Sequence, residues 1–297
     1  MEFSQWSQQA RGRVEAVLSQ ALLLRKSMPE GRGDAVLHEA MAYGVLGGGK
    51  RVRALLAIAA GEAVGAQTAW CDTVGAAIEC IHAFSLVHDD MPCMDDDALR
   101  RGLPTVHVKY GQAQALLVGD ALQTLGFELI ADLPAPAPVV VRLVKLLSVA
   151  TGLQGMAGGQ AVDIEAVGKA MSQDQLEAMH GLKTGALIAA AVEMGACCAS
   201  PAQADQAALK RFAGLIGLSF QVADDVLDVS ADAQTLGKTP GKDAAANKPT
   251  FVALLGLEGA QGYARDLHRQ ALAAIAPLGS RADALRGLAQ ALVERTH

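Results

Sequence analysis

Two clusters of carboxylates, far apart in the sequence, have the composition of metal sites. The first contains Asp89, Asp90 and Asp95, and Arg100 and Arg101 follow it closely. Crowding like charges costs free energy unless cations share the site. Carboxylate oxygens suit Mg²⁺, which often bridges a protein to substrate phosphates, and arginine forks bind the same phosphates. This cluster predicts a metal-bridged diphosphate site, with a solvated acidic loop as the alternative.

The second cluster has the spacing of one helical face. Gln221, Asp224, Asp225 and Asp228 are separated by three, four and seven positions. Such residues share a face of a helix. The neighbouring residues are apolar, so a second set of carboxylates stands beside a buried helix surface. Two independent clusters argue against the solvated-loop alternative.

Basic residues near the first cluster could hold an anion. The glycine run at 47–49 precedes Lys50 and Arg53, which we expect on one helical face, three residues apart. A glycine helix stop followed by a solvated basic turn is the alternative. His82 lies about two turns before Asp89 on the same predicted face. A hydrogen-bonded structural histidine is the other interpretation of His82.

Three lysines in the second half of the chain are further candidates. Lys183 lies in an otherwise apolar stretch and would need an anion there, although its side chain could also extend to solvent. Turn-forming residues surround Lys238 and Lys248, so the segment 231–249 predicts a mobile basic lid. A plain surface loop is the alternative for this segment.

The composition predicts an all-α fold that positions these residues. The chain has 297 residues, 51% of them hydrophobic but only 4% aromatic, and it is rich in helix formers. We expect one domain over residues 1–297, because the loop at 132–138 has no linker composition. The glycines between Gly155 and Asp163 would let helices pack closely around a cavity. Ser172 and Gln175 have the form of a capping box. Helices are expected at about 3–26, from 34, at 73–90, 112–130 and 138–153, and after Ser172, Ser200 and Thr250.

Charge and cysteine usage exclude several classes of protein. The net charge of -6 and a pI near 5.6 argue against a nucleic-acid partner. The five cysteines fit no zinc or redox spacing. There is no signal pattern, and the apolar runs are too short for a membrane span, so we expect a cytoplasmic protein. The mean hydropathy of +0.25 predicts an apolar cavity or a buried interface in a homo-oligomer.

Six ordered motifs resemble those of the trans-isoprenyl diphosphate synthases, and are closest to the bacterial-type short-chain farnesyl diphosphate synthases. They are Gly48–Arg53, Asp89–Asp95, Arg100–Thr105, Gly159–Gln160, Lys183–Thr184 and Gln221–Asp228. The resemblance implies an all-α homodimer whose helices surround a deep apolar cavity. It also implies condensation of isopentenyl diphosphate with dimethylallyl or geranyl diphosphate to farnesyl diphosphate. The reaction would proceed by magnesium-assisted ionisation, 1'-4 condensation and proton elimination.

The resemblance also implies a role for each candidate residue. The residues that would bind magnesium, expected as three ions that Mn²⁺ could replace, are Asp89, Asp95 and Asp224, supported by Asp90 and Asp228. Those that would contact the allylic diphosphate are Arg100, Lys183 and Lys238, with Lys248 less secure because it follows Asn247. Those that would hold isopentenyl diphosphate are Lys50, Arg53, His82 and Arg101. Those that would lie near the allylic cation are Thr184 and Gln221.

The sequence leaves the product length open, and it departs from the family pattern at Ala54. Phe84 resembles a floor that stops chain growth, whereas the small Ser85 beside it is compatible with a geranylgeranyl product. The other hypotheses are a geranyl product, a terpene cyclase and a non-catalytic prenyltransferase subunit. Cyclases lack the second acidic motif, and a non-catalytic subunit could lose its aspartates. Ala54 stands where a proline is common, which we expect to alter only the helix start.

Overall fold

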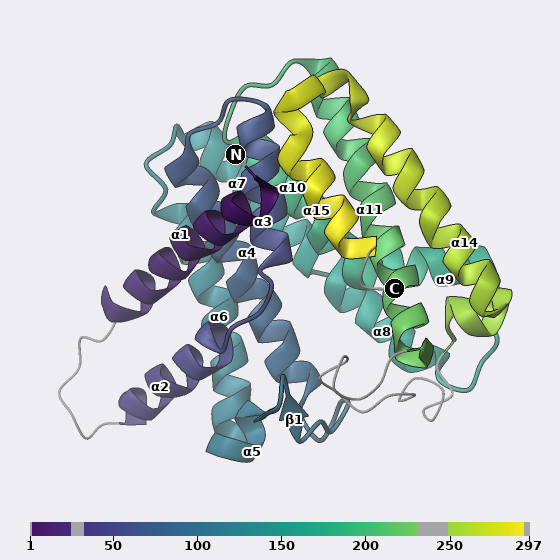
Figure 1. Ribbon diagram of the computed structural model, residues 1–297. Helices are drawn as coiled ribbons and strands as arrows, with labels where there is room; N and C mark the ends of the chain where they lie inside the picture. Colours follow the sequence, from purple (N-terminus) through teal and green to yellow (C-terminus); the bar gives the residue numbers. More distant parts are fainter. Residues whose placement is uncertain (1, 25–32, 231–248, 294–297) are drawn as a thin grey trace.

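The protein is almost entirely helical in a computed structural model that describes residues 2–24, 33–230 and 249–293 (Figure 1). This confirms the all-α prediction. The first helices are α1 (Phe3–Leu24), α2 (Gly33–Leu46), α3 (Val52–Ala63), α4 (Thr68–Asp89), α5 (Val106–Tyr110), α6 (Gln112–Ala131) and α7 (Ala137–Thr151). The later ones are α8 (Met156–Ala166), α9 (Gln173–His180), the π-helical turn η1 (Gly181–Gly185), α10 (Ala186–Cys197), α11 (Gln203–Ser230), α14 (Phe251–Ala274), the 3₁₀ helix η2 (Ala276–Ala282) and α15 (Asp283–Val293).

A short hairpin follows the first acidic motif. β1 (Leu99–Arg100) pairs antiparallel with β2 (Leu103–Pro104), and Arg100 lies opposite Leu103. The turn between them places Arg101 and Gly102 at φ 54° and 76°. Left-handed backbone is easy for glycine but costs energy at arginine. The turn therefore holds Arg101 in a conformation that its surroundings must stabilise.

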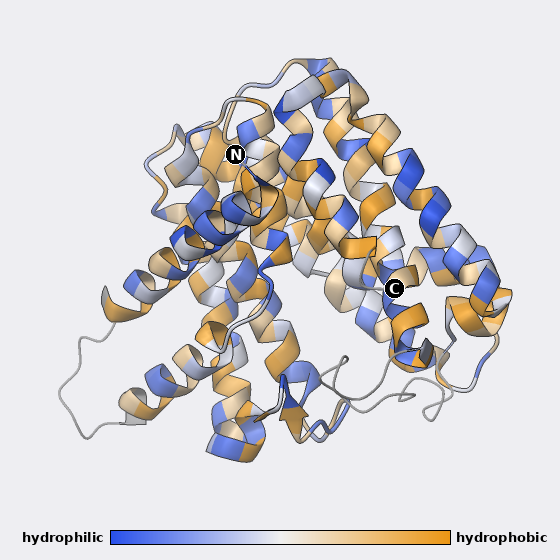
Figure 2. Cartoon of the chain, in the orientation of Figure 1, coloured by the Kyte–Doolittle hydropathy of each residue, from blue (hydrophilic) through white to orange (hydrophobic). Residues whose placement is uncertain are grey.

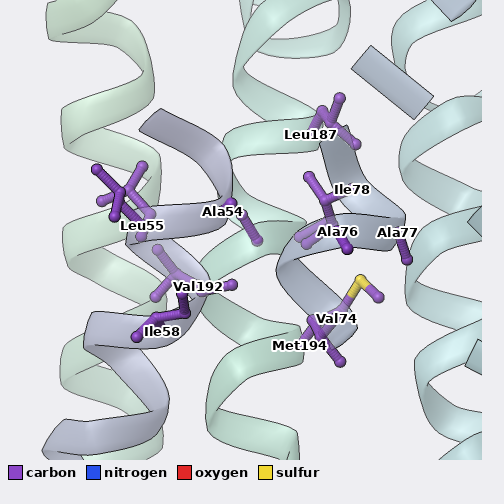
Figure 3. Close-up of a cluster of buried hydrophobic side chains, with 14 of the residues drawn as sticks. Ala54, Leu55, Ile58, Val74, Ala76, Ala77, Ile78, Leu187, Val192 and Met194 are labelled. Carbon is purple, nitrogen blue, oxygen red and sulfur yellow. The ribbon is translucent and has the colours of Figure 1, made fainter. Parts of the chain in front are cut away.

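The main hydrophobic core is centred on α3, α4 and α10. Figure 3 shows side chains from these three helices meeting, among them Ile58, Ile78 and Val192, which are fully buried. Small residues let the helices approach closely. A Cβ on Gly195 would lie 1.9 Å from the carbonyl oxygen of Ala57. This tight, aliphatic packing agrees with the low aromatic content.

A second cluster of buried side chains joins α9, α11 and α14. It includes Leu176, Val222 and Phe251. α11 is long enough to reach both clusters, since its first half buries Phe212 in the main core. α11 and α14 pack along each other (Figure 1), and hydrophobic and hydrophilic residues alternate along most helices (Figure 2). α11 therefore connects the core to the part of the fold that carries the second acidic motif.

Two local expectations can be compared directly with the structure. The predicted capping box is present: Ser172 accepts from the Gln175 N–H, and its own N–H donates to Gln175 Oε1 over 2.9 Å. The sequence predicts no stretch long enough to span a membrane. Among the described residues, however, the segment 137–166 has the length and hydropathy of a membrane span. This stretch nevertheless forms two helices, α7 and α8, which a break at 152–155 separates. A single domain stays a prediction.

Candidate active site

The first acidic motif lies where α4 ends and the chain turns back. Pro92 cannot continue helical hydrogen bonding, and the Asp95 N–H donates to the carbonyl oxygen of Asp89 over 2.9 Å. The chain therefore folds back after α4 and brings Asp95 beside Asp89. Burial, together with the charges of Asp95 and Asp90, raises the pKa of Asp89 to about 6. A divalent cation bound here would relieve that crowding of negative charge.

Asp90 is held by an arginine of the hairpin. Its side chain is only 4% exposed, and it accepts two hydrogen bonds from Arg100 Nε, at 2.8 and 2.9 Å, and one from Nη2 at 2.5 Å. Such a two-pronged pair fixes the guanidinium as well as neutralising it. Asp90 therefore positions Arg100 at the wall of the cavity. Its role as a supporting metal ligand stays a prediction.

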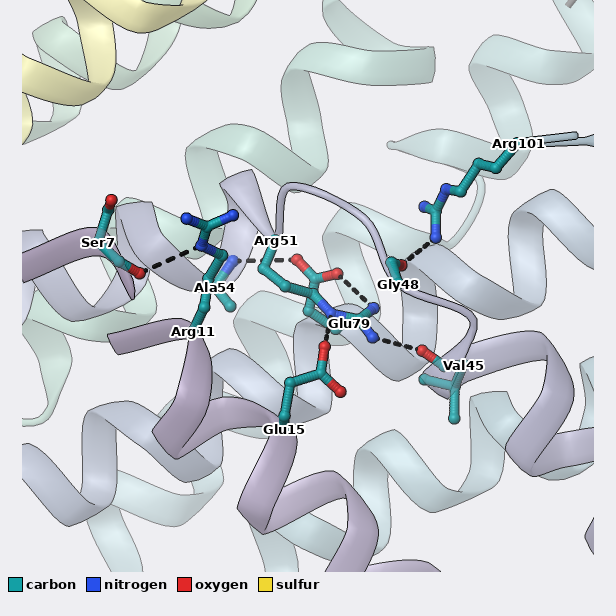
Figure 4. Close-up of polar contacts among 9 residues, drawn as sticks. All are labelled: Ser7, Arg11, Glu15, Val45, Gly48, Arg51, Ala54, Glu79 and Arg101. Carbon is teal, nitrogen blue, oxygen red and sulfur yellow. Dashed lines mark hydrogen bonds and ion pairs between the residues drawn. The ribbon is translucent and has the colours of Figure 1, made fainter. Parts of the chain in front are cut away.

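The glycine loop supports the second arginine. Gly48 and Gly49 have φ of 82° and 124°, and the Arg101 guanidinium donates to the Gly48 carbonyl (Figure 4). A Cβ on Gly49 would come within 2.8 Å of the Arg101 nitrogens. The glycines of this motif are needed both for their backbone conformation and for the close approach of Arg101.

The expectation that Lys50 and Arg53 share a helical face is wrong. α3 begins only at Val52, and Arg51 before it has φ 50°, which takes the chain out of the helical path. Lys50 is exposed ahead of the helix, whereas Arg53 lies in its first turn and reaches the cavity. The prediction from the spacing of three residues was wrong because α3 starts after Lys50, so only Arg53 belongs to the helix.

Arg51 is a structural residue that sequence reasoning did not single out. Its buried guanidinium donates to Glu15 at 2.7 Å, to Glu79 at 3.3 Å and to the Val45 carbonyl at 2.6 Å (Figure 4). Glu79 also accepts from the Ala54 N–H at 3.2 Å. A proline at position 54 would lack that donor. Ala54 therefore does more than alter the helix start, which corrects the sequence expectation.

Cations gather at one end of the cavity around His82. The Nε of Arg53 is buried and has no hydrogen-bond partner among the residues described. Burial, together with the nearby charges of Arg53 and Arg101, holds the pKa of His82 well below its usual range. Guanidinium groups packed beside a neutral imidazole would be stabilised by an anion. This arrangement fits a phosphate group better than a structural histidine.

α8 and the π-helical turn η1 meet through a glycine. A Cβ on Gly159 would lie 2.2 Å from the Lys183 nitrogen and 2.5 Å from its Cα. This confirms that the glycines of α8 permit close helix packing. Lys183 Nζ pairs with Asp163 Oδ2 at 2.5 Å, and Thr184 Oγ1 donates to Gln221 Oε1 at 3.1 Å. The contact with Gly159 thus sets the position of both Lys183 and Thr184. Both residues belong to a π-helical turn, an element that is frequent at functional sites.

Replacing Gly159 by alanine is expected to lower kcat about 100-fold, because a shift of about 1 Å in the position of a group at the active site reduces the rate by about that factor. The added methyl group meets backbone atoms of Lys183, which must shift. The control is Gly181→Ala in the same turn, where an added Cβ has no atom within 4 Å. Steady-state kinetics and thermal melts of both variants are the measurement. Wild-type kcat in the Gly159 variant would show that the packing does not position Lys183.

The second acidic motif divides its carboxylates between two tasks. Asp224 is half-buried and lines the cavity. Asp225 is 2% exposed and accepts from the Phe251 N–H at 2.8 Å and from Gln221 Nε2 at 2.9 Å. Asp228 is 4% exposed and is not among the residues that line the cavity. Asp224 and Asp225 both line the cavity, and Asp225 also fastens the start of α14 to α11.

These walls enclose a cavity of about 400 Å³ that combines both motifs. The predicted residues that line it are Arg53, His82, Asp95, Arg100, Arg101, Lys183, Thr184, Gln221 and Asp224. Phe84 and Ser85 are half-buried on α4 but do not line it, and the Phe84 ring packs edge-on against His88, with centroids 5.7 Å apart. Lys238 and Lys248 lie outside the described residues. Most of the predicted site is therefore one connected space.

The carboxylates of the cavity fit magnesium that shares its coordination with a substrate. Within 2–24, 33–230 and 249–293, no three acidic, histidine or cysteine side chains lie close enough to hold a metal by themselves. Magnesium usually takes one or two carboxylates and completes its shell with water and phosphate oxygens. Asp95 and Asp224 line the cavity and could supply such carboxylates, whereas Asp89 is not among the lining residues and its metal-binding role stays a prediction.

Two further cavity residues were missed by sequence reasoning. Asp163 pairs with Lys183, and His180 lines the same wall. His180 stands three residues before Lys183, a spacing that would place both on one face of an α-helix. That spacing was a usable signal, but neither an isolated histidine nor an isolated aspartate is distinctive in a helical sequence.

Comparison with known proteins decides the family. Residues 34–278 match the sequence profile described as polyprenyl synthetase. The chain belongs to the polyprenyl synthetase family. It is 51% identical over 289 residues to a probable farnesyl diphosphate synthase of Bradyrhizobium diazoefficiens, covering 96% of this chain and 86% of that one. The expectation of a trans-prenyl diphosphate synthase is thereby confirmed.

Solved structures share the whole polyprenyl synthetase fold. An FPP/GFPP synthase of Zymomonas mobilis is similar with a TM-score of 0.87 and 38% identity, over 98% of both chains. A geranyltransferase of Helicobacter pylori, complexed with magnesium and isoprenyl diphosphate, has a TM-score of 0.84 and 34% identity, over 99% of this chain and 97% of that one. The magnesium requirement expected from the sequence agrees with this neighbour.

Proposed function

We propose that this polyprenyl synthetase joins isopentenyl diphosphate to dimethylallyl or geranyl diphosphate and releases farnesyl diphosphate. One observation carries the proposal: a single cavity is lined by the carboxylates of Asp95 and Asp224 and also by Arg53 and Arg101 around the neutral His82, a group that we call the cationic end. The condensation needs two diphosphate sites of different character. A terpene cyclase, which has one diphosphate substrate, has no use for the cationic end.

The acidic walls are proposed to bind the allylic diphosphate together with magnesium. Asp89 and Asp95 would supply carboxylates from α4 and the turn after it, and Asp224 would supply one from α11. When bound, magnesium would neutralise charge on the departing diphosphate. Three ions and replacement by Mn²⁺ remain part of the proposal, as does a supporting role for Asp228.

The basic residues of this wall would hold the same diphosphate. Arg100 is already oriented by Asp90, and Lys183 by Asp163. Preoriented cations stabilise a leaving group without reorganising during the reaction. Thr184 and Gln221, which share a hydrogen bond, would direct their oxygens toward the allylic cation. Lys238 and Lys248 remain predicted contacts from outside the described residues.

The cationic end is proposed to bind isopentenyl diphosphate. Arg53, His82 and Arg101 would meet its diphosphate, and the exposed Lys50 would reach it from the loop before α3. Fixing this diphosphate places the alkene against the allylic carbon, which raises the effective concentration of the two reactants. A dry apolar surrounding would protect the cation from water.

Product analysis tests the proposed reaction. The purified protein is incubated with magnesium, labelled isopentenyl diphosphate, and dimethylallyl or geranyl diphosphate, and the product is identified by chromatography. We expect a fifteen-carbon linear diphosphate. The absence of a condensation product would contradict the enzyme assignment, and a cyclic hydrocarbon from the allylic substrate alone would indicate a cyclase.

Replacing Phe84 by alanine is expected to lengthen the product by one or more isoprene units. In the proposal the ring blocks the growing chain, and removing it opens space along α4. Chromatography of the product diphosphates is the measurement. Phe84→Tyr keeps the ring and should leave the product length unchanged. An unchanged product spectrum in the alanine variant would show that another residue forms the floor.

A geranylgeranyl product is the second candidate. Ser85 beside Phe84 is small, and a geranylgeranyl pyrophosphate synthase of Capsicum annuum is 42% identical to this chain over 262 residues. A twenty-carbon product from the wild-type protein would favour this reading, whereas a ten-carbon product would favour a geranyl diphosphate synthase.

A homodimer is proposed from the uncovered apolar side chains of α6 and α7. Leu116, Leu117, Val141 and Val149 are 49%, 48%, 67% and 42% exposed. Exposed apolar side chains gathered on neighbouring helices mark an interaction surface. We expect a dimer in sedimentation velocity and a monomer for Leu117→Lys combined with Val141→Lys. A wild-type monomer would contradict the proposal. A cytoplasmic location stays a prediction.

A further inference from the structure

His180 is a buried imidazole in the cavity wall without a hydrogen-bond partner. It is the last residue of α9 and is only 8% exposed. Neither Nδ1 nor Nε2 has a partner within the described part of the chain. Leaving buried polar atoms unpaired costs free energy, so such groups usually meet water or a ligand. The side chain lines the cavity together with Lys183, Thr184 and Asp224.

Packing fixes the orientation of the His180 ring. It lies against Phe251, with ring centroids 5.6 Å apart and planes inclined by 31°. Phe251 is fully buried, and its N–H is bonded to Asp225 at 2.8 Å. The second acidic motif therefore holds the aromatic side chain that supports His180.

Burial keeps His180 neutral. Burial lowers its pKa to about 4, and Lys183 acts in the same direction against the opposing charge of Asp163. A neutral imidazole offers one N–H donor and one acceptor nitrogen. It can thus donate to an anion without adding a second buried cation beside Lys183. None of the roles given above to the cavity residues uses this donor.

We propose that His180 is a further diphosphate-binding residue, whose ring N–H donates to an oxygen of the diphosphate held by Lys183. Three observations carry this: the unpaired nitrogens, the ring fixed by Phe251 and the position in the wall that also presents Asp163 and Lys183. The inference rests on the proposed function, since it requires the acidic side of the cavity to take a magnesium diphosphate.

Binding of inorganic pyrophosphate with magnesium tests the contact by calorimetry. His180→Phe keeps the ring stack but removes both nitrogens, and we expect its Kd to rise about tenfold, as for the loss of one hydrogen bond to a charged group. His180→Gln retains a donor and should recover part of the affinity. His268→Phe is the matched control, because its Nδ1 is also unpartnered but it does not line the cavity. Its Kd should equal that of the wild type.

Thermal unfolding separates binding from folding. Without ligand, we expect His180→Phe to melt at or above the wild-type temperature, because it removes unpaired polar atoms from a buried place. A large loss of melting temperature with unchanged pyrophosphate affinity would overturn the proposal and assign His180 a structural role. If the wild type does not bind magnesium pyrophosphate at all, the proposed function of the cavity fails with it.

The ring nitrogens of His180 provide a direct readout. With ¹⁵N-histidine, the His180 signals, assigned by their absence in His180→Phe, should change when pyrophosphate is added to the magnesium-saturated protein. A change with magnesium alone and none with pyrophosphate would indicate a metal-bound water as the partner and would overturn the proposal. No change in either step would also overturn it.

Discussion

Replacing Asp224 by asparagine should reduce kcat by about 10³-fold while the protein stays folded. Asp224 is half-buried and lines the same cavity as Asp95. The substitution keeps the size of the side chain but removes the charge that would bind magnesium on this wall. Loss of one preorganised electrostatic contact to a departing group costs about 10² to 10³ in rate, and metal binding weakens as well. Steady-state kinetics over a magnesium titration is the measurement.

The neighbouring Asp225 gives a contrast within the same motif. Its carboxylate accepts from the Phe251 N–H and from Gln221, so Asp225→Asn should lower the melting temperature. Excess magnesium should recover part of the activity of the Asp224 variant. If Asp224→Asn kept kcat within about threefold of the wild type, α11 would not supply a metal ligand.

Replacing Arg51 by methionine should destabilise the protein by about 3 to 5 kcal/mol, the usual cost of removing one partner of a buried ion pair. The guanidinium and Glu79 are each only 3% exposed, and the substitution leaves Glu79 charged among apolar helices. The carbonyl of Val45 also loses its donor. Urea unfolding monitored by circular dichroism gives the change in free energy of unfolding.

A double variant and a surface pair test the cause of that loss. Adding Glu79→Gln to Arg51→Met removes the buried charge and keeps an acceptor for the Ala54 N–H, so it should recover part of the stability. Arg286→Met breaks a pair with Asp283 in which the aspartate is 71% exposed, and should cost less than about 1 kcal/mol. Equal losses for Arg51→Met and Arg286→Met would show that the buried network contributes little.

The candidate site was predictable where it depends on patterns among residues close together in the sequence. The helical spacing of Gln221, Asp224 and Asp225 placed the second acidic motif correctly, because helix periodicity is a local property. The same holds for the capping box at Ser172 and for the glycine contact of α8. Roles of individual residues in metal and substrate binding stay predictions.

What failed depended on contacts between distant segments. Lys50 does not share a helical face with Arg53 because Arg51, at φ 50°, lies outside the helix and donates to Glu15, which is 36 positions away. The sequence shows that a glycine loop precedes basic residues, but not which arginine will be buried.

The sequence by itself determined the all-helical fold and the two acidic motifs, since periodicity and residue type are enough for both. Only the tertiary structure decided how the carboxylates divide their tasks. Asp90 holds Arg100, Asp225 holds the start of α14, and Asp224 faces the cavity. Adjacent aspartates look alike in a sequence. They differ here because each meets a partner from another segment, and the packing of the helices selects that partner.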